Sequence, residues 1–217
     1  MTRLKVCGIT RADDAELAVE VGAWAVGFIL WPGSKRYVEP AMAAGIARSV
    51  RRRTELVGVF VNPTLDEVAH AADLMGLTHV QLHGDEGPSF CAAAAQRTGC
   101  RVIKALRVRS RADVADAQRY HTDLHLLDSP GNGESWDWGL AGERHTRIPL
   151  VVAGGLTPEN VGEAIAQARP WAVDVASGIE AAPGIKDPAK VRAFAAAVAE
   201  AAGVPSAAMT GAQREAE

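Results

Sequence analysis

A thiol and a carboxylate stand at the ends of two short apolar runs, where each could transfer a proton. Cys7 closes the run "LKVC" (residues 4–7), just before Gly8, and Asp128 closes "LHLLD" (residues 124–128). As a thiolate Cys7 could act as a base, and a protonated Asp128 could act as an acid. Each also has a simpler explanation, because a cysteine often fills a core and an aspartate often caps a helix or forms a salt bridge.

The alternation of residues along these runs indicates where the two groups point. Side chains of a strand alternate between its two faces, so Lys5 and Cys7 share one face of the first run. Asp128 shares a face with Leu124 and Leu126 in the second run. If both faces line the interior of a barrel, Cys7 and Asp128 look across the same mouth from nearly opposite sides.

Further polar residues and glycines follow other apolar runs. The polar candidates at such positions are Arg36, Asn62, His83, Arg107 and Asp174. The glycine turns Gly154-Gly155 and Ser177-Gly178 could offer backbone N–H groups to an anion. Such turns also arise for geometric reasons alone, but the last two loops of a barrel are a common phosphate site, so together they predict phosphate binding.

Eight β-branched runs alternate with helical patterns and predict the elements that position these residues. The runs cover residues 3–8, 23–30, 55–62, 78–84, 101–106, 123–129, 149–155 and 171–178, and helical patterns cover 11–22, 39–53, 64–76, 88–99, 110–120, 157–168 and 187–203. Successive strand–helix units imply a parallel sheet, and eight units close most simply into a barrel. We therefore predict an α/β fold, a single (β/α)8 (TIM) barrel, with a doubly wound open sheet as the alternative.

The ends of the helical patterns are marked by residues that start or stop helices. Plausible N-caps are Thr64, Thr157 and Asp187, with Pro158 and Pro188 at first helical positions, and Gly22, Gly76, Gly99 and Gly203 suit helix ends. The sixth unit is weak, because only residues 136–145 are available for its helix. The barrel domain is expected over residues 1–203, with residues 204–217 as a disordered tail.

Composition limits the class of protein. The chain of 217 residues is 48% hydrophobic, enough for a full core, and its net charge of −3 lacks the basic field typical of nucleic-acid binding. Neither a signal-peptide pattern nor a run long enough to cross a membrane is present, so we expect a cytoplasmic protein. Three cysteines without a C-x-x-C pair predict neither a disulfide frame nor a zinc site, and no nucleotide-binding motif occurs.

An ordered set of motifs resembles the phosphoribosylanthranilate isomerase family of tryptophan biosynthesis. The motifs are "KVCGIT", "GFILWPGSKRYV", "VGVFVN", "VQLHGDE", "IKALRV", "LLDS", "AGGLTPENV" and "VDVASGIEAAPGIKD", which together span roughly residues 3–200. The resemblance implies a monofunctional isomerase that performs an Amadori rearrangement of a small-molecule substrate, an anthranilate-linked ribose phosphate. It implies no cofactor and no metal, and we expect a monomer or a homodimer.

The resemblance also implies roles for particular residues. Cys7 is expected to be the general base and Asp128 the general acid. Arg36 is expected near the anthranilate carboxylate, His83 and Asp174 in the substrate cavity, and Gly154, Gly155, Ser177 and Gly178 at the phosphate. A thiolate needs positive charge close by, and Lys5, which shares the inward face in the substrate pocket, could supply it.

Two departures from the family pattern leave other functions open. "DSPGNGESWDW" (residues 128–138) stands where the family has a longer loop ending in G-G-T-G-x-x-F-D-W, and Ala176 replaces a frequent serine. The alternatives are a dual-substrate isomerase of histidine and tryptophan synthesis, a diverged isomerase of a related amino-sugar phosphate, and a non-catalytic barrel that binds a phosphorylated ligand. The first normally uses an aspartate at the position of Cys7.

Overall fold

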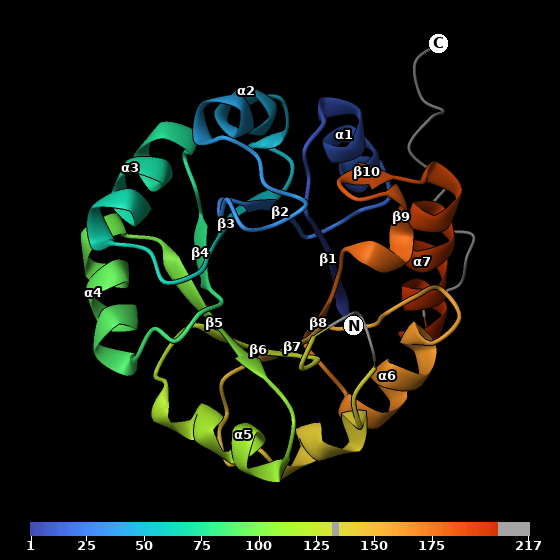
Figure 1. The fold of residues 1–217 in the computed structure, drawn as a ribbon. Coiled ribbons are helices and arrows are strands. Elements are labelled where there is room, and N and C mark those ends of the chain that lie inside the picture. Colours follow the sequence, from blue (N-terminus) through green and yellow to red (C-terminus); the bar gives the residue numbers. More distant parts are fainter. Residues whose placement is uncertain (132–134, 204–217) are drawn as a thin grey trace.

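Eight parallel strands close into a barrel in the computed structural model, which describes residues 1–131 and 135–203 (Figure 1). The strands are β1 (Arg3–Cys7), β2 (Ala25–Ile29), β3 (Glu55–Phe60), β4 (His79–Leu82), β5 (Arg101–Arg107), β6 (Leu124–Asp128), β7 (Leu150–Val152) and β8 (Ala172–Val175). The barrel closes where β8 pairs with β1, and the register there sets Lys5 beside Asp174. The predicted (β/α)8 fold is confirmed, and the open sheet is excluded. The predicted tail, residues 204–217, lies outside the described residues.

Helices surround the barrel and fill most of the connections between strands (Figure 1). They are α1 (Ala12–Glu20), α2 (Pro40–Val50), α3 (Leu65–Met75), α4 (Pro88–Thr98), α5 (Arg111–Asp116), α6 (Val161–Ala168) and α7 (Pro188–Ala201), with the 3₁₀ turns η1 (Ala117–Arg119), η2 (Trp138–Glu143) and η3 (Ser177–Ile179). The weak sixth unit has η2 in place of an α-helix. All of these helices are too short or too polar to span a bilayer, within the ranges that the structure describes.

Most of the predicted helix ends are confirmed. The Thr64 hydroxyl accepts a hydrogen bond from the backbone N–H of Glu67, whose carboxylate accepts one from the backbone N–H of Thr64, so the two form a capping box. Asp187 accepts hydrogen bonds from two backbone N–H groups at the start of α7. Gly76 and Gly99 end α3 and α4 in the left-handed conformation that glycine adopts without strain.

The predicted start of the helix after β7 is wrong. Helix α6 begins at Val161, so Thr157 is not its N-cap and Pro158 is not its first residue. The side chain of Asn160 explains the delay, because its Oδ1 accepts from the Thr157 N–H (2.8 Å) and its Nδ2 donates to the Gly155 carbonyl (2.8 Å). These bonds hold residues 155–160 as a loop that continues the glycine turn.

Two apolar layers give the barrel its core. One lies between strands and helices and includes Leu4 and Val6, while the other lies inside the barrel. The inner layer consists of Cys7, Ala25, Val57, Val59, Ile103, Ala105, Leu124, Leu126, Val151, Ala153 and Ala172. The alternation read from the sequence therefore placed Cys7, Leu124 and Leu126 on the correct face.

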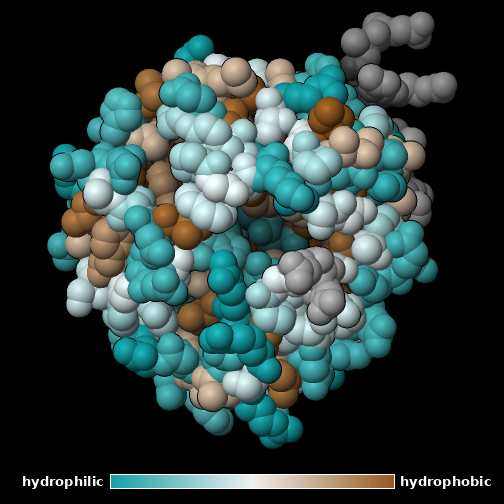
Figure 2. Space-filling view, in the orientation of Figure 1, coloured by the Kyte–Doolittle hydropathy of each residue, from teal (hydrophilic) through white to brown (hydrophobic). Residues whose placement is uncertain are grey.

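A small hairpin after β8 was not predicted. It pairs β9 (Glu180–Ala182) with β10 (Ile185–Lys186) in antiparallel fashion and lies between β8 and α7 in the chain. The space-filling view is hollowed over the barrel axis, and hydrophilic residues gather in that hollow (Figure 2). The hairpin stands beside this opening, with α1 and α7 close to it (Figure 1).

Candidate active site

A cavity of about 440 Å³ opens at the carboxyl ends of the strands. Its polar lining includes Cys7, Arg36, Gln81, His83, Arg107, Asp128, Asp174 and Ser177, together with Gly154 and Gly155. Most of the residues predicted for the site therefore share one cavity. Lys5 and Gly178 are not in the lining, and Asn62 lies in a neighbouring cavity that is lined by residues on or just after β3, β4 and β5.

Cys7 sits in a space that a glycine keeps open. A Cβ atom on Gly27, the neighbour of Cys7 on β2, would lie 2.7 Å from the Cys7 Sγ, so a side chain there would displace the thiol. Lys5 lies below the cavity, wholly buried, and its Nζ donates to Asp174 Oδ2 at 2.9 Å. Lys5 was expected to contact substrate in the pocket, but its buried side chain instead contacts Asp174 and affects the pKa of Cys7.

The surroundings of Cys7 favour the thiol over the thiolate. Burial raises the pKa of Cys7, and the Asp174 carboxylate raises it further, while Lys5 and Lys186 act in the opposite direction with a smaller total effect. The sequence led us to expect that Lys5 would stabilise a thiolate. The structure gives Lys5 that direction of effect, but desolvation and Asp174 outweigh it.

Asp128 ends a chain of three hydrogen-bonded side chains. The Gln81 Nε2 lies 3.1 Å from His83 Nδ1, and His83 Nε2 lies 3.1 Å from Asp128 Oδ2. An amide nitrogen only donates, so in this orientation Nδ1 of His83 accepts and the ring proton sits on Nε2. The Asp128 carboxylate then accepts from His83 Nε2–H and, through Oδ1, from the Ser129 backbone N–H (2.8 Å).

The two glycine turns meet at the mouth of the barrel. Gly154 and Gly155 have positive φ angles of 86° and 63°, and a Cβ on Gly154 would lie 2.7 Å from Asp128 Oδ1. Gly178 does not line the cavity. Its α-carbon faces the Leu156 carbonyl, and an added Cβ would overlap that oxygen. Gly178 thus lets the loops after β7 and β8 pack together.

Replacing Gly178 with alanine is expected to force these two loops apart. Overpacking of this kind costs about 1–3 kcal/mol of folding stability. Because the sequence predicts that these loops bind phosphate, we expect their displacement to raise the substrate KM about tenfold or more. Steady-state kinetics measures the change, and Gly162→Ala is the control, because a Cβ at that position on α6 meets open space. An unchanged KM in Gly178→Ala would show that the loops do not need this contact.

Arg36 reaches the cavity from the loop after β2, but it does not lie there alone. Its Nε and Nη2 donate to the two carboxylate oxygens of Glu180, both at 2.8 Å. Gly8, with φ 74°, leaves room for this side chain, since a Cβ at that position would lie 2.7 Å from the Arg36 Cδ. Glu180 in turn contacts Lys186 at 3.1 Å.

Sequence reasoning missed three residues near the site, namely Gln81, Glu180 and Lys186. Gln81 shares the inward phase of β4 with His83, and that alternation was a usable signal. Glu180 and Lys186 lie in the motif "GIEAAPGIKD", where a proline–glycine pair between opposite charges suggests a turn. Nothing in that motif indicates that the two charges are buried against Arg36.

A closed barrel whose strands end at a polar cavity defines the chain as a (β/α)8-barrel enzyme. A family model described as N-(5'phosphoribosyl)anthranilate (PRA) isomerase matches residues 4–197. The chain belongs to the N-(5'-phosphoribosyl)anthranilate isomerase family, and it is an isomerase.

Relatives with this name align along nearly their whole length. The N-(5'-phosphoribosyl)anthranilate isomerase of Citrifermentans bemidjiense is 46% identical, covering 88% of this chain and 94% of that protein. The crystal structure of phosphoribosyl anthranilate isomerase from Thermus thermophilus has a TM-score of 0.85 and 39% identity, over 92% of this chain and 99% of that one. Another isomerase structure, in complex with reduced 1-(o-carboxyphenylamino)-1-deoxyribulose 5-phosphate, has a TM-score of 0.81 and 39% identity, over 94% of this chain and 100% of that one.

Proposed function

We propose that the protein converts N-(5'-phosphoribosyl)anthranilate to 1-(2-carboxyphenylamino)-1-deoxyribulose 5-phosphate in tryptophan biosynthesis. Asp128 is the general acid and Cys7 the general base of this Amadori rearrangement. The observation that carries the proposal is the shared cavity, in which Cys7 on β1 and Asp128 on β6 face each other from nearly opposite sides of the barrel. Membership of the family supports the same reaction.

The acid opens the ribose ring. A protonated Asp128 gives its proton to the ring oxygen as the bond from that oxygen to C1′ breaks, and the lone pair of the anilino nitrogen forms a protonated Schiff base with C1′. The carboxylate left behind accepts hydrogen bonds from His83 Nε2–H and the Ser129 N–H. Both bonds strengthen as the charge on Asp128 develops, so they lower the barrier of this step.

The base completes the rearrangement. The Cys7 thiolate takes the proton from C2′, and the electrons of that C–H bond form an enolamine that tautomerises to the ketone. Because burial and Asp174 raise the pKa of Cys7, the thiol predominates at neutral pH and must lose its proton before this step. The rate is therefore expected to increase with pH above neutrality.

The remaining polar groups bind the two ends of the substrate. Arg36 holds the anthranilate carboxylate, while backbone groups of Gly154, Gly155 and Ser177 hold the phosphate and Gly178 keeps the two loops together. His83 and Asp174 line the space between. Asp174 lines the cavity, so its carboxylate is placed to accept from a ribose hydroxyl.

Lys5→Met is expected to shift the rising limb of the pH–rate profile, where Cys7 loses its proton, to higher pH. Lys5 lowers the pKa of Cys7, so its loss raises that pKa and leaves less thiolate at any given pH. Where the thiol predominates, a pKa that is higher by about 1 leaves a tenth as much thiolate. Measuring kcat/KM against pH tests this, with Lys190→Met as the control on α7. An identical profile for Lys5→Met and the wild type would contradict the role of Lys5.

The reaction itself is tested by following the loss of the fluorescent anthranilate-linked substrate. Turnover by the wild-type protein, without added metal or cofactor, supports the proposal. A wild-type protein that binds a sugar phosphate but does not consume this substrate would instead favour a diverged amino-sugar phosphate isomerase or a non-catalytic binding barrel. A monomer or a homodimer remains our prediction for the assembly.

A further inference from the structure

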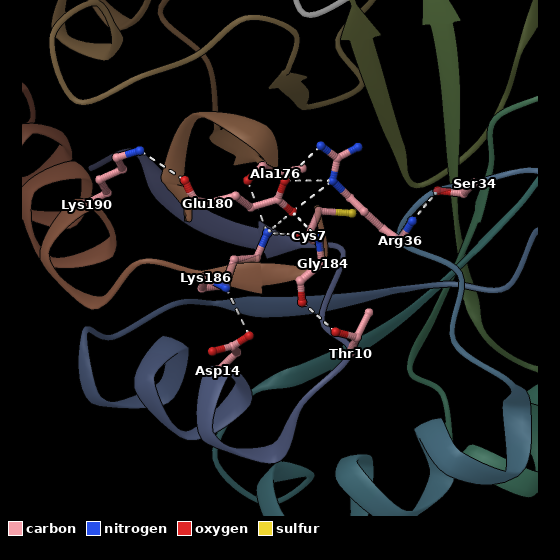
Figure 3. Close-up of polar contacts among 10 residues, drawn as sticks. All are labelled: Cys7, Thr10, Asp14, Ser34, Arg36, Ala176, Glu180, Gly184, Lys186 and Lys190. Carbon is pink, nitrogen blue, oxygen red and sulfur yellow. Dashed lines mark hydrogen bonds and ion pairs between the residues drawn. The ribbon is translucent and has the colours of Figure 1, made fainter. Parts of the chain in front are cut away.

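A group of three charged side chains extends from the cavity into the protein, and two of its members contact no substrate group in the proposal above. We call Arg36, Glu180 and Lys186 the charge cluster. Glu180 begins β9 and Lys186 ends β10, so the two arms of the hairpin bring them together (Figure 3). The side chain of Glu180 is 5% exposed and that of Lys186 is 0% exposed, whereas Arg36 is 24% exposed at the cavity.

Glu180 binds the Nε/Nη2 edge of the Arg36 guanidinium. The bonds run from Nε to Oε1 and from Nη2 to Oε2, which is the side-on arrangement of an arginine–carboxylate pair. Burial disfavours the charged carboxylate, but bonds from Arg36 and Lys186 outweigh that effect and hold the pKa of Glu180 below its usual range. The Gly184 backbone N–H also donates to Glu180 Oε1, at 3.2 Å. The position of the carboxylate is therefore fixed from several directions.

The side-on pair determines which donors of Arg36 remain for a ligand. A guanidinium has five N–H groups, and Glu180 takes Nε–H and one N–H of Nη2. Of the other three, one on Nη1 and one on Nη2 form the end-on edge, where a carboxylate can make a second two-point contact. The last N–H, on Nη1, points toward the Cδ side. Since Arg36 lines the cavity, a substrate carboxylate can meet that edge. Without the pair with Glu180, the guanidinium could rotate, and neither edge would face the cavity consistently.

Lys186 restores the positive charge that Glu180 cancels on Arg36. A carboxylate paired with Arg36 cancels the charge that should attract a second carboxylate. Lys186 contributes a further cation, so the charge cluster holds two positive groups and one negative group, a net charge of +1. The Lys186 Nζ also donates to the carbonyls of Cys7 (2.7 Å) and Ala176 (3.1 Å). It thereby ties the cluster to the ends of β1 and β8.

We propose that Glu180 is a positioning residue that makes the site specific for a substrate carboxylate. It holds Arg36 so that the end-on edge faces the cavity, and Lys186 keeps the charge cluster positive. This inference rests on the proposed function, in which Arg36 receives the anthranilate carboxylate. It adds that Arg36 alone is insufficient, because the geometry of its pair with Glu180 sets the preference.

Two ligands measure the preference directly. One is the reduced product analogue, 1-(o-carboxyphenylamino)-1-deoxyribulose 5-phosphate in reduced form, and the other is the same compound with a phenyl group in place of the carboxyphenyl group. The ratio of their Kd values, by calorimetry, is the carboxylate preference. We expect Glu180→Gln to reduce this preference about tenfold, the effect of losing well-oriented charged hydrogen bonds, with the Kd of the phenyl compound within about twofold of wild type.

The double variant Glu180→Gln, Lys186→Met separates orientation from charge. It removes one anion and one cation, so the cluster keeps a net charge of +1 on Arg36, and no buried lysine is left unpaired. A reduced preference in this variant supports positioning by Glu180, whereas a preference equal to that of the wild type overturns it. Lys190→Met is the matched control, since the Lys190 Nζ donates to the backbone carbonyl of Glu180 (3.0 Å) and, among the described residues, forms no ion pair with the charge cluster, so its loss should not change the ratio.

Arg36→Met distinguishes failure of this inference from failure of the proposed function. If Arg36→Met removes the preference and both Glu180 variants retain it, the role of Glu180 is wrong while the assignment of Arg36 stands. If Arg36→Met itself retains the preference, the carboxylate binds elsewhere, and both the assignment of Arg36 and the role of Glu180 are overturned.

Discussion

Replacing Cys7 with alanine is expected to reduce kcat about 10²–10⁴-fold, the usual contribution of one well-placed proton-transfer group. The side chain is buried at the end of β1 and lines the cavity, and Gly27 leaves space for its sulfur. Alanine removes the base without adding volume, so substrate binding should change little. The loss therefore belongs in kcat, and a fluorescence assay of substrate consumption measures it directly.

The other two cysteines are natural controls for this experiment. Cys91 and Cys100 are also buried thiols, but neither lines the cavity, and burial raises the pKa of both. Cys91→Ala and Cys100→Ala should therefore keep kcat near the wild-type value. Cys7→Ser tests the chemistry further, because a hydroxyl loses its proton far less readily than a thiol. Full activity in Cys7→Ala would require another base and would remove the main support for the mechanism.

Asp128→Asn is the second change with a large expected effect, again a decrease in kcat of about 10²–10⁴-fold. An asparagine oxygen can still accept from His83 Nε2–H, although its amide nitrogen cannot accept from the Ser129 N–H as Asp128 Oδ1 does. The amide also has no acidic proton to give to the ring oxygen. Ring opening then becomes slow. Single-turnover measurements should show that the loss occurs before formation of the enolamine.

An exposed aspartate provides the matched control. Asp66 lies in the first turn of α3, its side chain is 94% exposed, and it does not line the cavity. Asp66→Asn changes the net charge by the same amount as Asp128→Asn, and we expect it to leave kcat unaltered. If Asp128→Asn kept wild-type activity while Cys7→Ala lost it, the proton on the ring oxygen would have to come from another group, and His83 would be the first to test.

Much of the barrel could be predicted because its signals are local. A strand is recognised from β-branched residues over a few positions, and a helix end from a cap such as Thr64 or a stop such as Gly76. Once a barrel was predicted, the two-residue alternation placed Cys7 on its inward face. Errors arose where a side chain altered the backbone nearby, as Asn160 does when it delays the start of α6.

Local patterns were therefore enough to predict the order of the elements, and they favoured an eight-unit barrel with Cys7 and Asp128 facing inward. The groups that surround these two residues are known only from the folded chain. Closure of the barrel brings Lys186 to the Cys7 carbonyl and Glu180 to Arg36, across separations of 179 and 144 residues. No local pattern encodes such partners, because they depend on the register of every strand between them. For the same reason the raised pKa of Cys7 could not be predicted: it results from burial and a carboxylate near the far end of the chain, which only the closed barrel places beside the thiol.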